Sequence, residues 1–238
     1  MNKIPDEVVD VWHKSVEVES NYDFWEEKPL ITCAQKKIRK AELLHIDLFS
    51  GCGGFSTGFE QAGFTTALAV DIHPPSLKTL HFNHQYATTI LGDIRRISSE
   101  MVTNCLEINN TPTVITAGVP CQGFSLANRK RNSDDKRNFL FKEFIRIAKD
   151  IKPTALVLEN VSGLVSTRGG GFKHDISEAI SDLGYDVYFS LLNAADYGVP
   201  QKRRRVFFVG VPKGTKWLFP GKTHGIKAGK PFNTVKDA

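Results

Sequence analysis

A cysteine and a glutamate each follow an apolar stretch of this chain, and together they suit covalent chemistry on an electrophilic ring. Cys121 lies in the turn Pro120-Cys121-Gln122-Gly123-Phe124-Ser125, shortly after the apolar run of residues 113–117. Glu159 directly follows a second apolar run, residues 155–158. A thiolate is a nucleophile, and a carboxyl group can supply a proton. If both runs are parallel strands, the two side chains meet at the sheet edge where open α/β sheets bind ligands.

The pattern around these residues predicts the elements that must position them. Strands are expected over residues 44–49, 66–70, 89–91, 113–117, 155–158, 185–192 and 206–211. Helices are expected over residues 55–62, from residue 74 onward, and over 98–106, 139–150 and 172–183. Because strands alternate with helices, the sequence predicts an α/β fold with a doubly wound, mostly parallel sheet.

The same pattern divides the chain into three parts. Residues 44–211 hold the alternating elements and are predicted to form one catalytic domain. Residues 1–43 lack sustained periodicity, so they are expected to form a partly helical N-terminal extension with no assigned function. Residues 212–238 contain several glycines and prolines without a clear element, and they are expected to be a linker.

Three consecutive predicted strands end in residues that suit a nucleoside. Gly51-Cys52-Gly53-Gly54 follows the first strand and opens a helix, where free backbone N–H groups can face a ligand. Asp71 ends the second strand and could accept hydrogen bonds from ribose hydroxyls, while Asp93 ends the third within reach of an adenine amino group. Each acid alone is more often a turn or cap residue, but three consecutive strands that end in ligand-type residues favour a ligand site. The Gly-x-Gly-Gly spacing departs from the dinucleotide pattern, so an adenosine compound such as S-adenosylmethionine is favoured.

Charge points to a polyanionic partner. The formal net charge is +5, and basic residues crowd two segments, residues 129–137 and 202–205. Such clusters favour nucleic acid, although a solvated surface run is the alternative. The four cysteines form no Cys-x-x-Cys pair, which argues against a metal site and against a disulfide framework.

No apolar run approaches the ~18 residues that span a membrane, and acids rather than a basic-then-apolar leader occupy the first residues. The chain is therefore expected to be cytoplasmic, and nucleoid-associated if its source is prokaryotic, with no membrane partner.

Five motifs, in this order and spacing, resemble the DNA (cytosine-5)-methyltransferase family. They are Asp47-Leu48-Phe49-Ser50-Gly51-Cys52-Gly53-Gly54, Pro120-Cys121-Gln122-Gly123-Phe124-Ser125, Glu159-Asn160-Val161, Asn193-Ala194-Ala195-Asp196-Tyr197-Gly198-Val199-Pro200 and Gln201-Lys202-Arg203-Arg204-Arg205. The resemblance begins near residue 44 and implies a Rossmann-like fold of the S-adenosylmethionine-dependent methyltransferases. It implies methyl transfer to carbon 5 of cytosine in double-stranded DNA, with S-adenosylhomocysteine as product, in a restriction-modification or other DNA modification system.

The resemblance also implies a role for each motif residue. Cys121 would add to carbon 6 of a flipped-out cytosine, with Pro120 in the same turn, and Glu159 would hydrogen-bond or protonate ring nitrogen 3. Burial could raise the pKa of Glu159 so that it carries that proton. Arg205 would contact the cytosine oxygen, Arg203 would help to place base and backbone, and Asn160 would hold the Cys121 loop.

Two further groups of contacts follow from the resemblance. The methyl donor would be bound by Asp47, Phe49, Gly51, Gly53, Gly54, Asp71, Ile72, Asp93, Ile94 and Leu140. DNA would be bound by Gln122, Ser125, Arg129 and Arg137, which lie in or after the nucleophile turn.

The family pattern continues beyond residue 238 into a target-recognition domain, two further motifs and a closing helix. We therefore expect a split enzyme whose second subunit carries recognition, a truncated chain, or a remnant of the fold. Three other functions stay open from the residues: methylation of cytosine in tRNA, non-catalytic nucleic-acid binding, and a nicotinamide dehydrogenase, which the glycine spacing disfavours.

Overall fold

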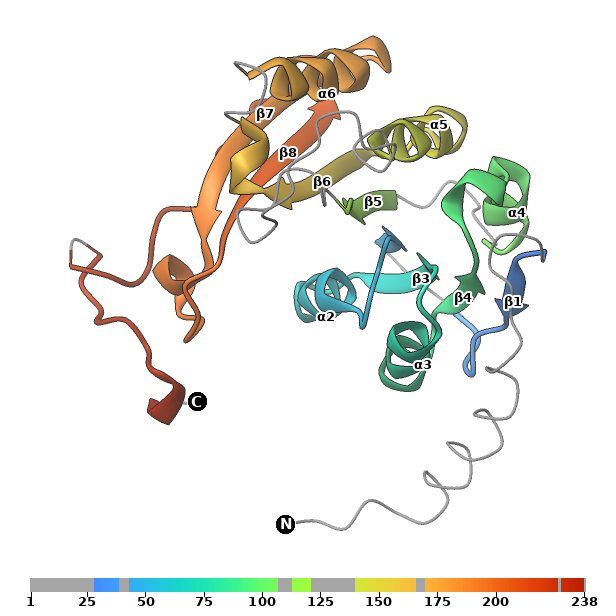
Figure 1. Cartoon of the computed structure of the whole chain (residues 1–238), viewed down its shortest axis with the longest axis horizontal. Helices are drawn as coiled ribbons and strands as arrows, with labels where there is room; N and C mark the ends of the chain where they lie inside the picture. Colours follow the sequence, from blue (N-terminus) through green and yellow to red (C-terminus); the bar gives the residue numbers. More distant parts are fainter. Residues whose placement is uncertain are drawn as a thin grey trace, which may run out of the picture.

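The computed structural model describes residues 28–38, 43–106, 113–120, 140–165, 170–226 and 228–237. Within them, one sheet has the strand order β1-β4-β3-β2-β5-β6-β8-β7 (Figure 1). The strands are β1 (Leu30–Thr32), β2 (Leu44–Leu48), β3 (Thr65–Asp71), β4 (Thr88–Leu91), β5 (Thr113–Gly118), β6 (Ala155–Val161), β7 (Tyr185–Asn193) and β8 (Arg204–Pro212). The confirmed fold class is α/β with a mostly parallel, Rossmann-like sheet.

Strand direction brings the predicted site residues to one edge. β4, β3, β2, β5 and β6 pair in parallel, so their carboxyl ends lie at the same edge. β8 runs antiparallel to β6, with Arg205 opposite Val161, so the beginning of β8 also lies at that edge. The residues that follow five strands and those that open a sixth can therefore face one ligand region.

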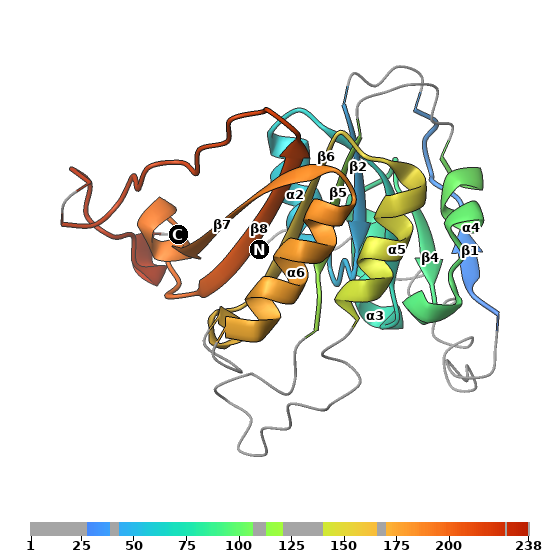
Figure 2. The ribbon, with the colours of Figure 1, turned by 90° about the horizontal axis from the view of Figure 1, so that it is seen from above.

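Helices cover both faces of the sheet. They are α2 (Gly54–Gln61), α3 (Pro74–Asn83), α4 (Ser99–Asn104), α5 (Phe141–Ile151) and α6 (Gly171–Asp182), with short 3-10 turns η1 (Ile94–Arg96), η3 (Ser162–Val165), η5 (Ala194–Tyr197) and η6 (Val235–Asp237). α2 and α3 lie on one face, and α4, α5 and α6 lie on the other (Figures 1 and 2). Phe144 of α5, Phe172 of α6 and Phe208 of β8 are fully buried in the core between helices and sheet.

α5 shows why the sequence forms these layers. Phe141, Phe144, Ile147 and Ala148 are buried, and their spacing places them on one side of a helix. The helix ends at Lys152, which adopts a left-handed conformation with φ of 51° and precedes a proline that cannot continue the helix. Burying each large apolar side chain contributes about 1.5–3 kcal/mol, so packing rather than propensity holds α5 on the sheet.

β1 is the main element that the sequence pattern did not predict. It lies in the segment expected to be partly helical, and it pairs antiparallel with β4, with Ile31 opposite Ile90. All three of its residues are exposed, so no burial pattern marks them as a strand. At the other end, the backbone N–H groups of Thr223 and His224 both donate to the carbonyl oxygen of Asp196 at 2.9 Å, which attaches the predicted linker to η5.

Candidate functional site

The predicted site straddles the point where the strand order reverses. From β2 the chain proceeds outward through β3 and β4, and then returns to β5 on the other side of β2. Open α/β sheets bind ligands at such a switch point. The turn at residues 51–54 follows β2, and Pro120 follows β5, so the predicted donor turn and the residue before the predicted nucleophile lie on either side of it.

The glycine turn has a backbone that few other residues adopt. Gly51 and Gly53 have φ of 54° and 91°, and Phe49, before the turn, has φ of 55°. A Cβ atom on Gly53 would lie 2.7 Å from Nε2 of His84, whereas one on Gly51 or Gly54 would meet nothing within 4 Å. Gly53 is thus required by both conformation and close packing, while open space lies beside Gly51 and Gly54. α2 begins at this turn with no side-chain cap.

Asp71 shapes the turn from the neighbouring strand. Its Oδ2 accepts a hydrogen bond of 2.7 Å from the backbone N–H of Gly51, and its Oδ1 accepts one of 2.8 Å from that of His73. Each carboxylate oxygen has a second lone pair, so Asp71 can hold the turn and still accept a hydroxyl. Its position at the end of β3 fits the predicted ribose contact.

Asp93 is tied to a neighbouring arginine. The Nε of Arg95 lies 3.0 Å from both carboxylate oxygens, and the backbone N–H of Arg95 donates to Oδ1 at 3.0 Å. Burial opposes ionisation of Asp93, but the hydrogen bonds and charge of Arg95 outweigh it and lower the pKa of Asp93. Asp93 therefore accepts hydrogen bonds as a carboxylate, and an adenine amino group would have to share it with Arg95.

The predicted apolar donor contacts differ in exposure. Ile72 is 40% exposed beside Asp71, so its side chain is free to pack against a flat ring. Ile94 is 5% exposed and belongs to the hydrophobic core, and Leu140 is partly buried and packs against the same core. Exposed apolar surface next to Asp71 and open space beside Gly51 are the features that an adenosine group requires, so the residues present fit S-adenosylmethionine.

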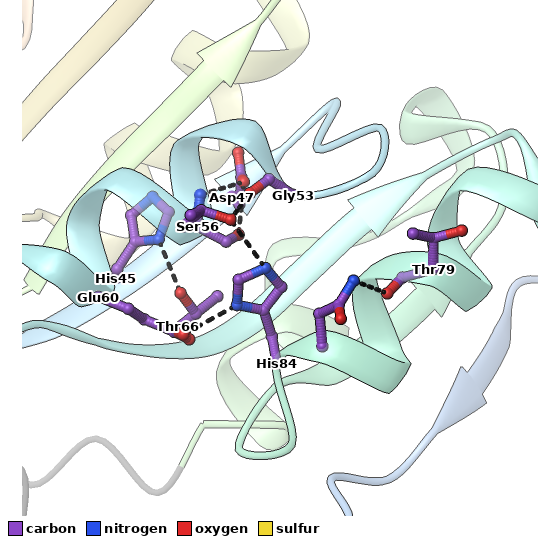
Figure 3. A network of polar contacts seen from close by, with 10 residues as sticks. His45, Asp47, Gly53, Ser56, Glu60, Thr66, Thr79 and His84 are labelled. Atoms are coloured by element: carbon purple, nitrogen blue, oxygen red, sulfur yellow. Dashed lines mark hydrogen bonds and ion pairs between the residues drawn. The ribbon is translucent and has the colours of Figure 1, made fainter. Parts of the chain in front are cut away.

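Asp47 was predicted to contact the donor, but it has no exposed surface. Its Oδ2 accepts hydrogen bonds from Oγ and the backbone N–H of Ser56 at 2.7 and 3.2 Å (Figure 3), and its Oδ1 accepts one from Oγ1 of Thr116 at 2.9 Å. These contacts join β2, α2 and β5. The geometry indicates that Asp47 supports the turn rather than touching a bound molecule.

Glu159 and two arginines form the polar centre beside β5. The Nε of Arg205 lies 2.8 Å from Oε1 of Glu159, and a terminal nitrogen of Arg203 lies 3.4 Å from the same oxygen. Burial raises the pKa of Glu159 above its usual value, and the charges and hydrogen bonds of both arginines offset part of that effect. The side chain is therefore a carboxyl group biased toward holding a proton, with two cations that steady its ionised form.

Asn160 connects this centre to the nucleophile strand. It is 2% exposed, and its Nδ2 donates to the carbonyl oxygen of Val119 at 3.3 Å. Val119 precedes Pro120, so the contact holds the segment that leads to Cys121. Cys121, Gln122, Ser125, Arg129 and Arg137 lie outside the described residues.

Two supporting residues were missed by sequence reasoning. A terminal nitrogen of Arg146 in α5 donates to the carbonyl oxygens of Ile94 and Ile97 at 3.1 and 2.8 Å, which fixes the turn after β4. His84 packs beneath Gly53, and its Nδ1 lies 2.9 Å from Oε2 of Glu60. Both side chains act across long sequence separations, so no local motif marks them.

The fold and the donor turn together define the class of S-adenosylmethionine-dependent methyltransferase folds. A family model described as C-5 cytosine-specific DNA methylase matches residues 43–237. The chain therefore belongs to the C-5 cytosine-specific DNA methylase family.

Individual relatives agree with this assignment. The chain is 40% identical to the Type II methyltransferase M1.HphI of Haemophilus parahaemolyticus, over 82% of this chain and 52% of that relative. It is 38% identical to the Type II methyltransferase M.AquIA of Picosynechococcus sp., over 81% of this chain and 86% of that relative. The chain thus spans about half the length of the first of these relatives and most of the second.

Solved structures show the same fold. The crystal structure of a protein described as a DNA modification methyltransferase encoded within a prophage (E. coli) is 32% identical with a TM-score of 0.67, over 82% of this chain and 53% of that one. The S. pombe Dnmt2 methyltransferase is 18% identical with a TM-score of 0.56, over 77% and 52% of the two chains, and supports the fold alone.

The described residues lack two kinds of feature. None of their helices combines the length and apolar character needed to cross a membrane. No cluster of three or more His, Cys, Asp or Glu side chains in these parts of the chain could hold a metal ion.

Proposed function

We propose that this chain carries the catalytic centre for methyl transfer from S-adenosylmethionine to carbon 5 of cytosine in DNA, within a restriction-modification or related system. The observation that carries the proposal is the partly buried Glu159, held by Arg205 and Arg203 and joined through Asn160 to the strand that ends just before Cys121. Membership of the C-5 cytosine-specific DNA methylase family supports the same reaction.

Each residue of this centre has a chemical role in the proposal. Cys121, as thiolate, forms a bond from its sulfur to carbon 6 of the cytosine ring. Glu159 donates a proton or a hydrogen bond to ring nitrogen 3, which draws the electron pair toward nitrogen as the sulfur attacks. Burial favours the protonated form of Glu159 that this step needs, because it raises the pKa of the carboxyl group. Carbon 5, made nucleophilic by this addition, takes the methyl group; a base then removes the carbon 5 proton and the sulfur leaves carbon 6. Arg205 contacts the exocyclic oxygen of the cytosine, and Asn160 maintains the approach of the Cys121 segment.

The binding site for the methyl donor is proposed to lie at the glycine turn of residues 51–54. S-adenosylmethionine, when bound, supplies a methyl group on a positively charged sulfur. The backbone of residues 51–54 leaves space for a close approach, Asp71 offers carboxylate lone pairs at the end of β3, and Ile72 offers exposed apolar surface. Arg146 and Arg95 hold the turn after β4 that borders this region.

The DNA side requires the target base to leave the helix. A cytosine stacked in a duplex cannot reach a thiol, so flipping it out costs a few kcal/mol. The basic residues at 129–137 and 202–205 supply charge to hold the phosphate backbone during that step.

Sequence recognition is proposed to come from outside residues 1–238, either in a second polypeptide or in a continuation of this chain, which would carry the target-recognition domain and the final motifs. Relatives such as M1.HphI are about twice as long as the matched region, whereas M.AquIA is covered over 86% of its length. Chains of the present length therefore exist beside longer ones in the family.

Methyl-transfer assays test the function directly. Radiolabelled S-adenosylmethionine is incubated with the chain, with and without the product of the adjacent reading frame, on duplex DNA and on tRNA. We expect label in DNA cytosines only, and strongly only with the partner. Label found only in tRNA would show that the substrate is RNA rather than DNA. No label in either substrate would reject the proposed methyl-transfer activity.

A further inference from the structure

A directed row of hydrogen bonds runs through the core beneath the glycine turn. Oγ1 of Thr116 donates to Oδ1 of Asp47, so it must accept from Nε2 of His45 at 2.9 Å. Nδ1 of His45 is then free to accept from Oγ1 of Thr66 at 3.2 Å. Burial, followed by the nearby charge of His84, lowers the pKa of His45 to about 3, so the ring stays neutral. The row ends on the Asp47 carboxylate.

The other end of Asp47 holds the donor turn. Ser56 lies in the first turn of α2, and both its hydroxyl and its backbone N–H donate to Oδ2 of Asp47. Thr116 lies in β5, four positions before Pro120. One buried carboxylate thus receives hydrogen bonds from the helix that follows the glycine turn (Figure 3) and from the strand that leads to Cys121.

We infer that Asp47 is a positioning residue that, as a carboxylate, fixes the donor turn relative to the nucleophile strand and so sets the affinity for the methyl donor. This inference rests on the proposed function, because it assigns the role to a donor site. Asp47 touches neither donor nor DNA in this account. It acts through Ser56 on one side and Thr116 on the other.

Loss of the carboxylate would disturb the turn, because three hydrogen-bond donors, two on Ser56 and one on Thr116, need an acceptor. A protonated Asp47 carries a hydrogen on one of its two oxygens, and asparagine replaces one oxygen by an NH₂ group, so in either form one of the two acceptor atoms presents a hydrogen to the hydrogen-bond donors of Ser56 or Thr116. The geometry is therefore suited to the ionised form only.

The surroundings of Asp47 place this change within an accessible pH range. Burial raises the pKa of Asp47 to about 6, the hydrogen bonds of Ser56 and Thr116 oppose that rise, and the charge of Asp71 on β3 adds to it. The other titratable groups that face this region are neutral His45 on β2, Glu60 on α2 and His84 after α3. Below about pH 6 the carboxyl is protonated, so the turn should loosen and donor affinity should fall.

Calorimetry with S-adenosylhomocysteine tests the inference. For the wild-type chain we expect affinity to fall by about five- to tenfold between pH 7.5 and pH 5. Asp47→Asn should bind at least tenfold more weakly at pH 7.5 and should lose the step in affinity near pH 6. Tyr188→Phe, which removes a hydrogen bond from β7 to Thr215, is the matched control and should bind within twofold of wild type. Asp71→Asn should weaken binding but keep the step.

A second readout uses the free chain, without donor. The backbone N–H resonance of Ser56 should shift with a midpoint near pH 6 in the wild type, and this shift should vanish in Asp47→Asn. If Asp47→Asn does not fold, Ser56→Ala and Thr116→Val provide the test. Each removes one hydroxyl that donates a hydrogen bond to Asp47, and each should weaken the binding of S-adenosylhomocysteine several-fold.

The outcomes separate the two claims. Wild-type affinity in Asp47→Asn, or a Ser56 resonance that does not shift near pH 6, would overturn the role of Asp47 while leaving the proposed function intact. Failure of the wild-type chain to bind S-adenosylhomocysteine at any pH, even at millimolar concentration, would reject the donor site and the inference with it.

Discussion

At the scale of single residues, Glu159 balances two opposing effects. Burial disfavours its charged form, and Arg205 and Arg203 favour that form from 2.8 and 3.4 Å. Because burial outweighs the arginines, the pKa of Glu159 is raised, and the residue can carry a proton at a pH where an exposed glutamate has lost it. The same arrangement limits how far the pKa rises, since each cation stabilises the carboxylate.

This balance predicts a dependence of methyl transfer on pH. The proton-donating form of Glu159 is lost as pH rises through its raised pKa, so the rate of the covalent step should fall there. Arg205→Ala removes the largest opposing charge and should move that fall to higher pH, whereas Arg205→Lys keeps the charge and should move it less. Single-turnover rates over pH 5–9 measure the shift. A fall that moved to lower pH in Arg205→Ala would contradict this description of Glu159.

Glu159→Gln gives a second prediction at this scale. Glutamine keeps a hydrogen-bonding side chain of the same size but cannot transfer a proton. We expect single-turnover methylation to fall by about 10²–10⁴-fold, the usual contribution of a general acid, with donor affinity unchanged. Donor affinity is measured by calorimetry on the same protein preparation. An unchanged methylation rate would show that Glu159 does not deliver a proton.

At the scale of elements, the glycine turn packs closely against His84 at the end of α3. Gly53 has φ of 91°, and a Cβ atom there would lie 2.7 Å from Nε2 of His84. Gly53→Ala should therefore lower the free energy of unfolding by about 2 kcal/mol through backbone strain and by more through the clash. It should also weaken donor binding, because the turn must shift. Chemical denaturation and calorimetry measure the two effects.

A double-mutant cycle separates strain from clash. His84→Ala removes the ring that a Cβ atom on Gly53 would meet, so the double variant should lose less stability than the sum of the single variants. The strain remains, so the double variant should still be less stable than His84→Ala alone. Strict additivity would show that the ring does not constrain Gly53. Gly63→Ala, at a glycine with φ of 90° and nothing within 4 Å, is the control for strain alone.

The elements also show how far sequence reasoning reaches. Apolar runs such as residues 44–48 and 155–158 mark buried strands, and Gly and Pro mark their ends, so the order of elements could be predicted. β1 could not, because its three exposed residues form a strand only through pairing with β4. The sequence motifs predicted Glu159 and Arg205 as site residues. The supporting position of Asp47 beneath the turn could not be predicted, because it depends on Ser56 and Thr116, which come from separate elements.

At the scale of the whole molecule, the chain brings the glycine turn and the Glu159 centre to one edge of the sheet. The family match covers residues 43–237, while the chain spans about half of relatives such as M1.HphI. We therefore predict that the isolated chain binds donor weakly and methylates DNA poorly or not at all. Labelled methyl transfer to a library of duplexes checks this. Robust, site-specific methylation by the chain alone would contradict the proposed need for recognition from outside residues 1–238.

The most direct measurement of the central claim is trapping on DNA that contains 5-fluorocytosine. Fluorine at carbon 5 blocks the final removal of a proton, so a thiolate that has added to carbon 6 stays attached after methyl transfer. Placing the modified base in a mismatch lowers the cost of flipping it, which reduces the need for a recognition domain. With S-adenosylmethionine and the polypeptide that carries the recognition domain present, we predict a denaturation-resistant complex for the wild-type chain and none for Cys121→Ala. A wild-type chain that binds donor yet forms no complex, or a complex that persists in Cys121→Ala, would contradict the account.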